Sequence, residues 1–127
     1  MADDESYETL TERGSGAFWK MLQDGLERPE FRRHYLLERE RMATIDRLIN
    51  QLDEAREALG VTKADLARTI ERKPETIRRL MTASSQNPQL GMVAEIAAAL
   101  GYRLELVPMS AAEKKQVAEP LRELADA

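Results

Sequence analysis

The sequence contains no cysteine and only one histidine, and aromatic residues make up 5% of its 127 residues. Without cysteine it can form neither disulfide bonds nor a thiolate metal site. His34 lies in an arginine-rich stretch, where a lone histidine is more typical of an exposed side chain than of a catalytic base. No metalloprotease, phosphate-loop or dinucleotide-binding motif occurs. We therefore expect no enzymatic activity, no catalytic residues, no metal and no cofactor.

Long hydrophobic runs are also missing. No stretch approaches the ~20 apolar residues that are needed to span a bilayer. The acidic beginning, MADDESYE, lacks the features of a signal peptide. We therefore expect a cytoplasmic protein without membrane contact. Hydrophobic residues still make up 43% of the chain, which is enough for the core of one helical domain.

The stretch 61–82, VTKADLARTIERKPETIRRLMT, predicts two short helices joined by a tight turn. Thr62, with Asp65 three residues later, predicts the N-terminal cap of the first helix, and Pro74 predicts the start of the second. Apolar residues recur on one face of each half. They are Leu66, Ala67 and Ile70 in the first half and Ile77, Leu80 and Met81 in the second. Two such helices form a helix-turn-helix, whose second helix can lie in the DNA major groove.

The charge distribution agrees with this interpretation. The chain has a net charge of −4, yet residues 61–82 carry more basic than acidic side chains. The basic residues are Lys63, Arg68, Arg72, Lys73, Arg78 and Arg79. Because phosphate neutralisation supplies most of the affinity for DNA, this local excess predicts that the two short helices face the duplex.

The region before position 29 predicts a tail and one short helix. Residues 1–16 are acidic, and a helical pattern runs from residue 17 to 24 and is expected to stop at Gly25. Its apolar cluster consists of Phe18, Trp19, Met21 and Leu22. This helix either packs on the main domain or contacts a partner protein, because Trp and Phe often anchor protein interfaces.

A long helical pattern begins at Pro29 and ends at Gly60. It fits one helix of roughly 30 residues, or two helices with a kink near Ala43 and Thr44. A polar loop follows position 82, and Asn87 and Pro88 predict the start of another helix, which ends before Gly101.

Residues 102–107 alternate between apolar and polar side chains, which predicts a β-strand. Because a single strand cannot satisfy its hydrogen bonds, we predict that it pairs with the same strand of a second molecule about a two-fold axis. Leu104 would lie on the axis, and the predicted cross-strand pairs are Arg103 with Glu105 and Tyr102 with Leu106. Such a homodimer would read an inverted repeat. Alternatively, the strand packs on its own helices and the long helix forms the dimer.

Residues 46–108 resemble the Cro/C1-type (XRE) helix-turn-helix regulators and, among them, the HigA-like antitoxins of toxin–antitoxin pairs. The resemblance lies in LGVTKADLARTI, IRRL and NPQLGMVAEIAAALGYRLELVP, and the upstream RPEFRRHYLLERER is similar to a helix that often precedes the domain. Two residues depart from the pattern: Glu71 stands where the family usually has Gly, and Lys73 where it favours Ser or Thr.

The expected fold is therefore all-α: a five-helix Cro/C1-type domain with a long preceding helix and one short C-terminal dimerising β-strand. We expect a tail and short helix over 1–28, the DNA-binding domain with its leading helix and strand over 29–108, and a C-terminal tail over 109–127.

The resemblance also implies site residues. It places Glu75 and Arg79 at base-reading positions, with Arg79 bidentate to a guanine and Glu75 accepting from a cytosine amino group. Thr76 is a further candidate for a base contact, and Lys63 lies where the family contacts phosphate. Charge and polarity add other candidates for phosphate contacts, namely Arg72, Lys73, Arg78, Ser84, Ser85 and Asn87. The alternative is that all of these are ordinary solvated side chains.

Two functions are compatible with these features. The first is a sequence-specific repressor that acts as a HigA-like antitoxin, represses its own operon and neutralises a RelE/HigB-like RNase toxin. Its partners would be an inverted-repeat operator in double-stranded DNA, the toxin, and a second copy of the chain. The alternative is a stand-alone Cro/C1-type transcriptional regulator without a toxin.

Overall fold

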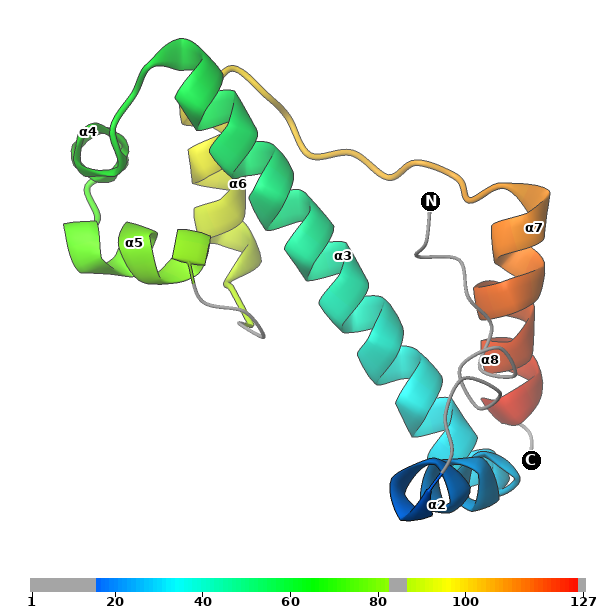
Figure 1. Ribbon diagram of the computed structural model, residues 1–127. Coiled ribbons are helices and arrows are strands. Elements are labelled where there is room, and N and C mark those ends of the chain that lie inside the picture. The colour runs from blue at the N-terminus through cyan, green and yellow to red at the C-terminus, as the bar shows by residue number, and fades with distance from the viewer. Residues whose placement is uncertain (1–15, 83–86, 126–127) are drawn as a thin grey trace. The chain divides into compact units, whose positions relative to one another are not determined.

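The computed structural model describes residues 16–82 and 87–125, and these ranges contain six helical stretches (Figure 1). The first five are α2 (Ala17–Leu26), α3 (Pro29–Leu59), α4 (Lys63–Thr69), α5 (Pro74–Thr82) and α6 (Leu90–Ala99). The last stretch consists of α7 (Ala111–Glu113), the π-helix η1 (Lys114–Ala118) and α8 (Glu119–Ala125). The chain divides into two compact units, here called the core unit (residues 44–106) and the flanking unit (residues 1–43 and 107–127).

The predicted C-terminal β-strand does not form. Within the described ranges no residue belongs to a strand, so both the strand and the count of five helices were wrong. Residues 102–110 are extended coil. The Tyr102 N–H donates to the Ala97 carbonyl at 2.7 Å and so closes the end of α6. Leu104 packs against the core, whereas Leu106 is 98% exposed.

The alternating pattern of this segment therefore produces extended backbone without a ladder. A strand needs a neighbouring strand that takes up its N–H and C=O groups. The described part of the chain contains no second strand beside it. The predicted dimer pairs, Arg103 with Glu105 and Tyr102 with Leu106, consequently have no strand on which to form.

The long helical pattern is one helix rather than two, because α3 runs without interruption over 31 residues. Its C-terminal part contributes an apolar stripe, which includes Ile49 and Leu52, to the core unit. Leu48 and Ala55 pack beside them and are partly buried. The stripe follows from the 3.6-residue period, which brings these positions to one side of the helix.

The core unit has a hydrophobic core to which α3, α4, α5 and α6 all contribute, together with the residue that follows α6. Its buried residues are Ile49, Leu52, Leu66, Ala67, Ile77, Leu80, Met92, Val93, Ile96, Ala97 and Leu100. The six apolar residues that recur on one face of the two short helices all pack in or against this core, with Ile70 and Met81 partly buried. Each fully buried Leu, Ile or Val contributes about 1.5–3 kcal/mol relative to an exposed side chain.

The flanking unit buries fewer apolar side chains in its described part: Leu26 of α2, Leu36 of α3 and Leu124 of α8. The Arg33 Nη1 donates to the Leu124 carbonyl at 3.1 Å and so satisfies one of the free carbonyls at the end of α8. At the other end of this helical stretch, Ser110 and Glu113 form a reciprocal capping box.

Gly25 has a different role from the predicted helix stop. It lies within α2, which continues to Leu26, and it is buried. A Cβ atom at this position would lie only 2.8 Å from the Phe31 ring. Close packing against the Phe31 ring, and not backbone conformation, therefore favours glycine here.

Candidate nucleic-acid interface

The two short helices are joined as the sequence predicts. The Asp65 N–H donates to the Thr62 Oγ1 at 3.0 Å, which caps α4. Hydrogen bonding to Thr62, and then the positive charge of Arg68, lower the pKa of the Asp65 carboxyl. Pro74 is the first residue of α5, where its missing N–H leaves no helical hydrogen bond unmade.

The turn after α4 requires a left-handed residue, and Glu71 provides it with φ 55°. The Glu71 N–H donates to the Arg68 carbonyl at 3.2 Å, and the Arg72 N–H donates to the Ala67 carbonyl at 2.9 Å. This pair of bonds is the Schellman motif. A non-glycine residue in this conformation costs roughly 1–2 kcal/mol. The turn therefore keeps its geometry although the residue favoured for it is absent.

Burial of one face of α5 determines which side chains point outward. Ile77 and Leu80 are buried, so the opposite face is turned to solvent. The predicted base readers Glu75 and Arg79 are both exposed and are four residues apart, which places them on neighbouring turns of the same face. Thr76 is only half-buried. The three predicted base-reading residues are thus accessible to different degrees, and their roles stay predictions.

The basic residues of this region fall into two groups. Three arginines form ion pairs: Arg68 with Asp65, Arg72 with Glu95 at 3.0 Å, and Arg78 with Glu75 at 3.8 Å. By contrast, Lys63, Lys73 and Arg79 form no ion pair with the described part of the chain. Lys63, Lys73 and Arg79 are therefore the basic residues of this region whose charge no carboxylate of the described chain neutralises.

The predicted phosphate contacts surround α5. Lys63 opens α4, Lys73 directly precedes α5, and Arg72 lies in the turn between the two helices. Asn87 is exposed, but α6 begins at Leu90 with Gln89 as its N-cap, later than the sequence predicted. The remaining two candidates, Ser84 and Ser85, lie outside the described residues.

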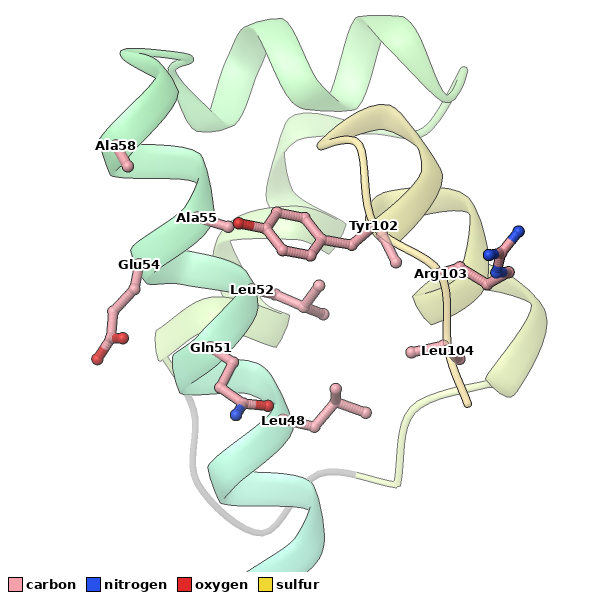
Figure 2. A pocket seen from close by; sticks show the side chains of 10 residues that line it. Leu48, Gln51, Leu52, Glu54, Ala55, Ala58, Tyr102, Arg103 and Leu104 are labelled. Carbon is pink, nitrogen blue, oxygen red and sulfur yellow. The ribbon is translucent and has the colours of Figure 1, made fainter. Parts of the chain in front are cut away.

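The structure brings three of the five predicted dimer residues together in a groove. Tyr102, Arg103 and Leu104 line it opposite the C-terminal part of α3, where Leu48 and Leu52 point toward Leu104 (Figure 2). The groove has a volume of about 440 Å³. The other two predicted residues, Glu105 and Leu106, are exposed and do not line it.

The predicted partner-contact residues lie on α2. Phe18 and Met21 are 62% and 65% exposed, whereas Trp19 and Leu22 are half-buried. The Phe18 and Trp19 rings meet edge to face with 5.5 Å between their centroids. Half of the predicted cluster is therefore presented to solvent.

One residue of the interface was not predicted from the sequence. Glu95 of α6 pairs with Arg72 across 23 positions of the chain, and it lies in a helix whose pattern pointed only to core packing. An i, i+3 or i, i+4 spacing reveals a pair within one helix, but no comparable signal exists for two elements that are far apart in sequence.

The described ranges contain neither a candidate metal site nor a candidate membrane-spanning helix. No group of three or more His, Cys, Asp or Glu side chains is arranged to hold a metal ion there. Nor does any helix in those ranges combine the length and apolar character needed to cross a bilayer.

Comparison with protein families gives one match: residues 47–108 fit the model of a helix-turn-helix domain. Comparison with curated proteins and with solved structures gave no match. The matched range includes α4, α5 and α6 together with the part of α3 that packs on them. Residues 47–108 are therefore similar to a helix-turn-helix domain, an architecture that DNA-binding regulators use.

Proposed function

We propose that this protein is a sequence-specific repressor that reads double-stranded DNA with α5. The observation that carries the proposal is the two-sided character of this helix. Ile77 and Leu80 fix one face in the core, so the face with Glu75 and Arg79 has a defined direction toward solvent. A reading helix must have such a fixed orientation, because base contacts depend on the register of the helix in the major groove.

The charges on and around this face support DNA as the ligand. Arg79 makes no ion pair with the described residues, so its guanidinium is available for the O6 and N7 atoms of a guanine. Lys63 and Lys73 lie at or just before the first residues of α4 and α5. Their ammonium groups can join the backbone N–H groups of these helix starts around phosphate oxygens.

The proposal is tested by titrating the protein against a duplex taken from its own promoter region. Arg79→Ala should cost about 1–3 kcal/mol and relax the preference at one base position. Lys63→Ala should weaken binding to all sequences alike and reduce the salt dependence. Arg47→Ala is the matched control, since it removes an exposed arginine of α3 that has no proposed role. Unchanged binding of Arg79→Ala at physiological salt would show that α5 does not read the operator.

A second part of the proposal concerns the toxin. The exposure of Phe18 and Met21 on α2 favours a protein partner, since exposed aromatic and Met side chains are enriched at protein interfaces. The proposed partner is a RelE/HigB-like toxin, on the basis of the resemblance to HigA-like antitoxins. The homodimer and the inverted-repeat operator also stay predictions, which sedimentation of the protein–operator complex checks.

Co-purification with the product of a neighbouring toxin-like reading frame tests this second part. Deletion of residues 1–28 should weaken co-purification and spare DNA binding. The double variant Phe18→Ala, Met21→Ala should reproduce the loss, and Gln23→Ala, an exposed polar position on the same helix, is the control. A protein that represses its promoter and captures no such product would instead be a stand-alone regulator.

A further inference from the structure

The three ion pairs of the DNA-facing region are not equivalent. Arg68 and Arg78 each pair with a carboxylate three residues earlier in the same helix. Such local pairs are common on any exposed helix. The pair of Arg72 with Glu95 joins the turn before α5 to a different helix, α6, and its atoms are 3.0 Å apart. It is therefore a tertiary contact, and it fixes a side chain at the entrance to the reading helix.

Arg72 is hydrogen-bonded through both its backbone and its side chain. Its backbone N–H donates to the Ala67 carbonyl at 2.9 Å as part of the helix end of α4. Its guanidinium donates through Nη2 to Glu95 Oε1. The two side chains are still 38% and 50% exposed, so an incoming phosphate can reach the guanidinium. Lys73, the next residue, has no such partner among the described residues.

We propose that Glu95 is a positioning residue that keeps Arg72 off the phosphate backbone and so lowers the affinity for DNA of any sequence. This inference rests on the proposed function, because it assumes that the turn and α5 face a duplex. A phosphate that binds Arg72 must compete with the Glu95 carboxylate for the guanidinium and must then remain beside the negative charge of that carboxylate. Both effects oppose a contact between phosphate and Arg72. Neither effect acts at Lys63, Lys73 or Arg79.

Glu95→Gln tests the proposal because it keeps the size of the side chain and a hydrogen-bond acceptor but removes the charge. The probe is a mixed-sequence duplex, titrated by fluorescence anisotropy over a series of KCl concentrations. The affinity should rise about two- to fivefold, the range expected for one exposed charge pair. The slope of log K against log salt should steepen by about 0.9, which corresponds to one additional phosphate contact.

A double-mutant cycle shows whether the effect acts through Arg72. In the Glu95→Gln background, Arg72→Ala should abolish both the gain in affinity and the steeper slope, and Arg72→Ala alone supplies the fourth corner of the cycle. Glu54→Gln is the matched control, since it removes an exposed carboxylate of α3 and changes the net charge by the same amount. It should leave the slope unchanged. All changed positions are exposed, and circular dichroism confirms that each variant is folded.

The outcomes separate this inference from the proposed function. If the wild-type protein binds duplex DNA with a salt-dependent affinity but Glu95→Gln binds identically, the inference is wrong and the proposed function stands. A gain that persists without Arg72, or that Glu54→Gln reproduces, also overturns it. If the wild-type protein binds neither the mixed-sequence nor the promoter duplex, the proposed function fails and this inference fails with it.

Discussion

The core unit and the flanking unit bury their apolar residues in different ways. In the core unit, a single cluster contains eleven buried residues. They come from α3, α4, α5 and α6, and from Leu100, which directly follows α6. In the described part of the flanking unit, three leucines are buried, and each comes from a different helix. In a shared cluster, the loss of one side chain destabilises every helix, because all of the helices pack on the same core. We therefore expect cooperative unfolding in the core unit and local opening in the flanking unit.

The two units also close their helices differently. In the core unit, α3, α4 and α6 end in left-handed residues, with φ values of 72° at Gly60, 55° at Glu71 and 87° at Gly101. In the flanking unit, the Arg33 side chain bonds a carbonyl at the end of α8. Backbone closure needs only local sequence, whereas the Arg33 bond joins residues 91 positions apart. The end of α8 thus depends more on tertiary packing.

The largest effect is expected from Ile96→Ala, which removes a fully buried side chain from the shared core. It should destabilise the core unit by about 2–5 kcal/mol, through lost burial and the cavity left behind. Chemical denaturation measures the change in the free energy of unfolding. Leu90→Ala on the same helix is the control, since Leu90 is 73% exposed, and it should cost less than about 0.5 kcal/mol. Equal costs for the two variants would mean that α6 does not pack as described.

A smaller effect is expected from Thr62→Ala, which removes the N-cap of α4. The substitution should lower the free energy of unfolding of the core unit by about 1 kcal/mol. It should also raise the pKa of the Asp65 carboxyl toward its ordinary value of 3.8, because the side-chain hydrogen bond to Thr62, the largest cause of the lowered pKa, is lost.

The sign of the pH dependence follows from the lowered pKa of Asp65. Its stabilising contribution is present above pH 3.8 and is lost as the pH falls through the lower folded-state pKa. NMR titration of Asp65 and denaturation over this range check both statements. Ser110→Ala is the comparison in the flanking unit, where the same kind of cap should leave the unfolding of the core unit unchanged.

Glu71→Gly should stabilise the core unit, because it brings the end of α4 to the same chemistry as the glycine ends of α3 and α6. The relief of left-handed strain exceeds the entropy that glycine adds to the unfolded chain, so we expect a gain of roughly 0.5–1 kcal/mol. Thermal unfolding measures it. Glu71→Ala keeps the strain and removes only the side chain, so it should give no gain. A stabilisation by alanine equal to that by glycine would point to the carboxylate and not to the backbone.

The smallest effect on the core unit is expected from Leu124→Ala. This variant removes one of the three buried leucines of the flanking unit, which share no cluster with the core unit. Hydrogen exchange should become faster over α8, while the free energy of unfolding of the core unit should change by less than about 0.5 kcal/mol. A loss as large as that of Ile96→Ala would show that the two units unfold as one.

Local sequence features predicted the two short helices and their turn well, because the causes are local. Thr62, Pro74 and the apolar spacing of the two short helices lie within a few residues of the atoms they organise. Even the departure at Glu71 was visible, since the turn needs a left-handed residue whatever its side chain. The same reasoning failed for Gly25, which was interpreted as a helix stop. Its true constraint, the ring of Phe31, comes from a different helix.

The sequence by itself determined the helix-turn-helix, its capped start, its turn and its outward-facing charges, because periodicity, caps and prolines act over a few residues. Only the tertiary structure decided that residues 102–107 are extended coil, since alternation selects an extended backbone but a ladder requires a second strand. The tertiary structure likewise decided that Arg72 forms an ion pair with a residue of another helix. Glu95 reaches Arg72 only after α6 has packed on the core, and no spacing in the sequence encodes that distance.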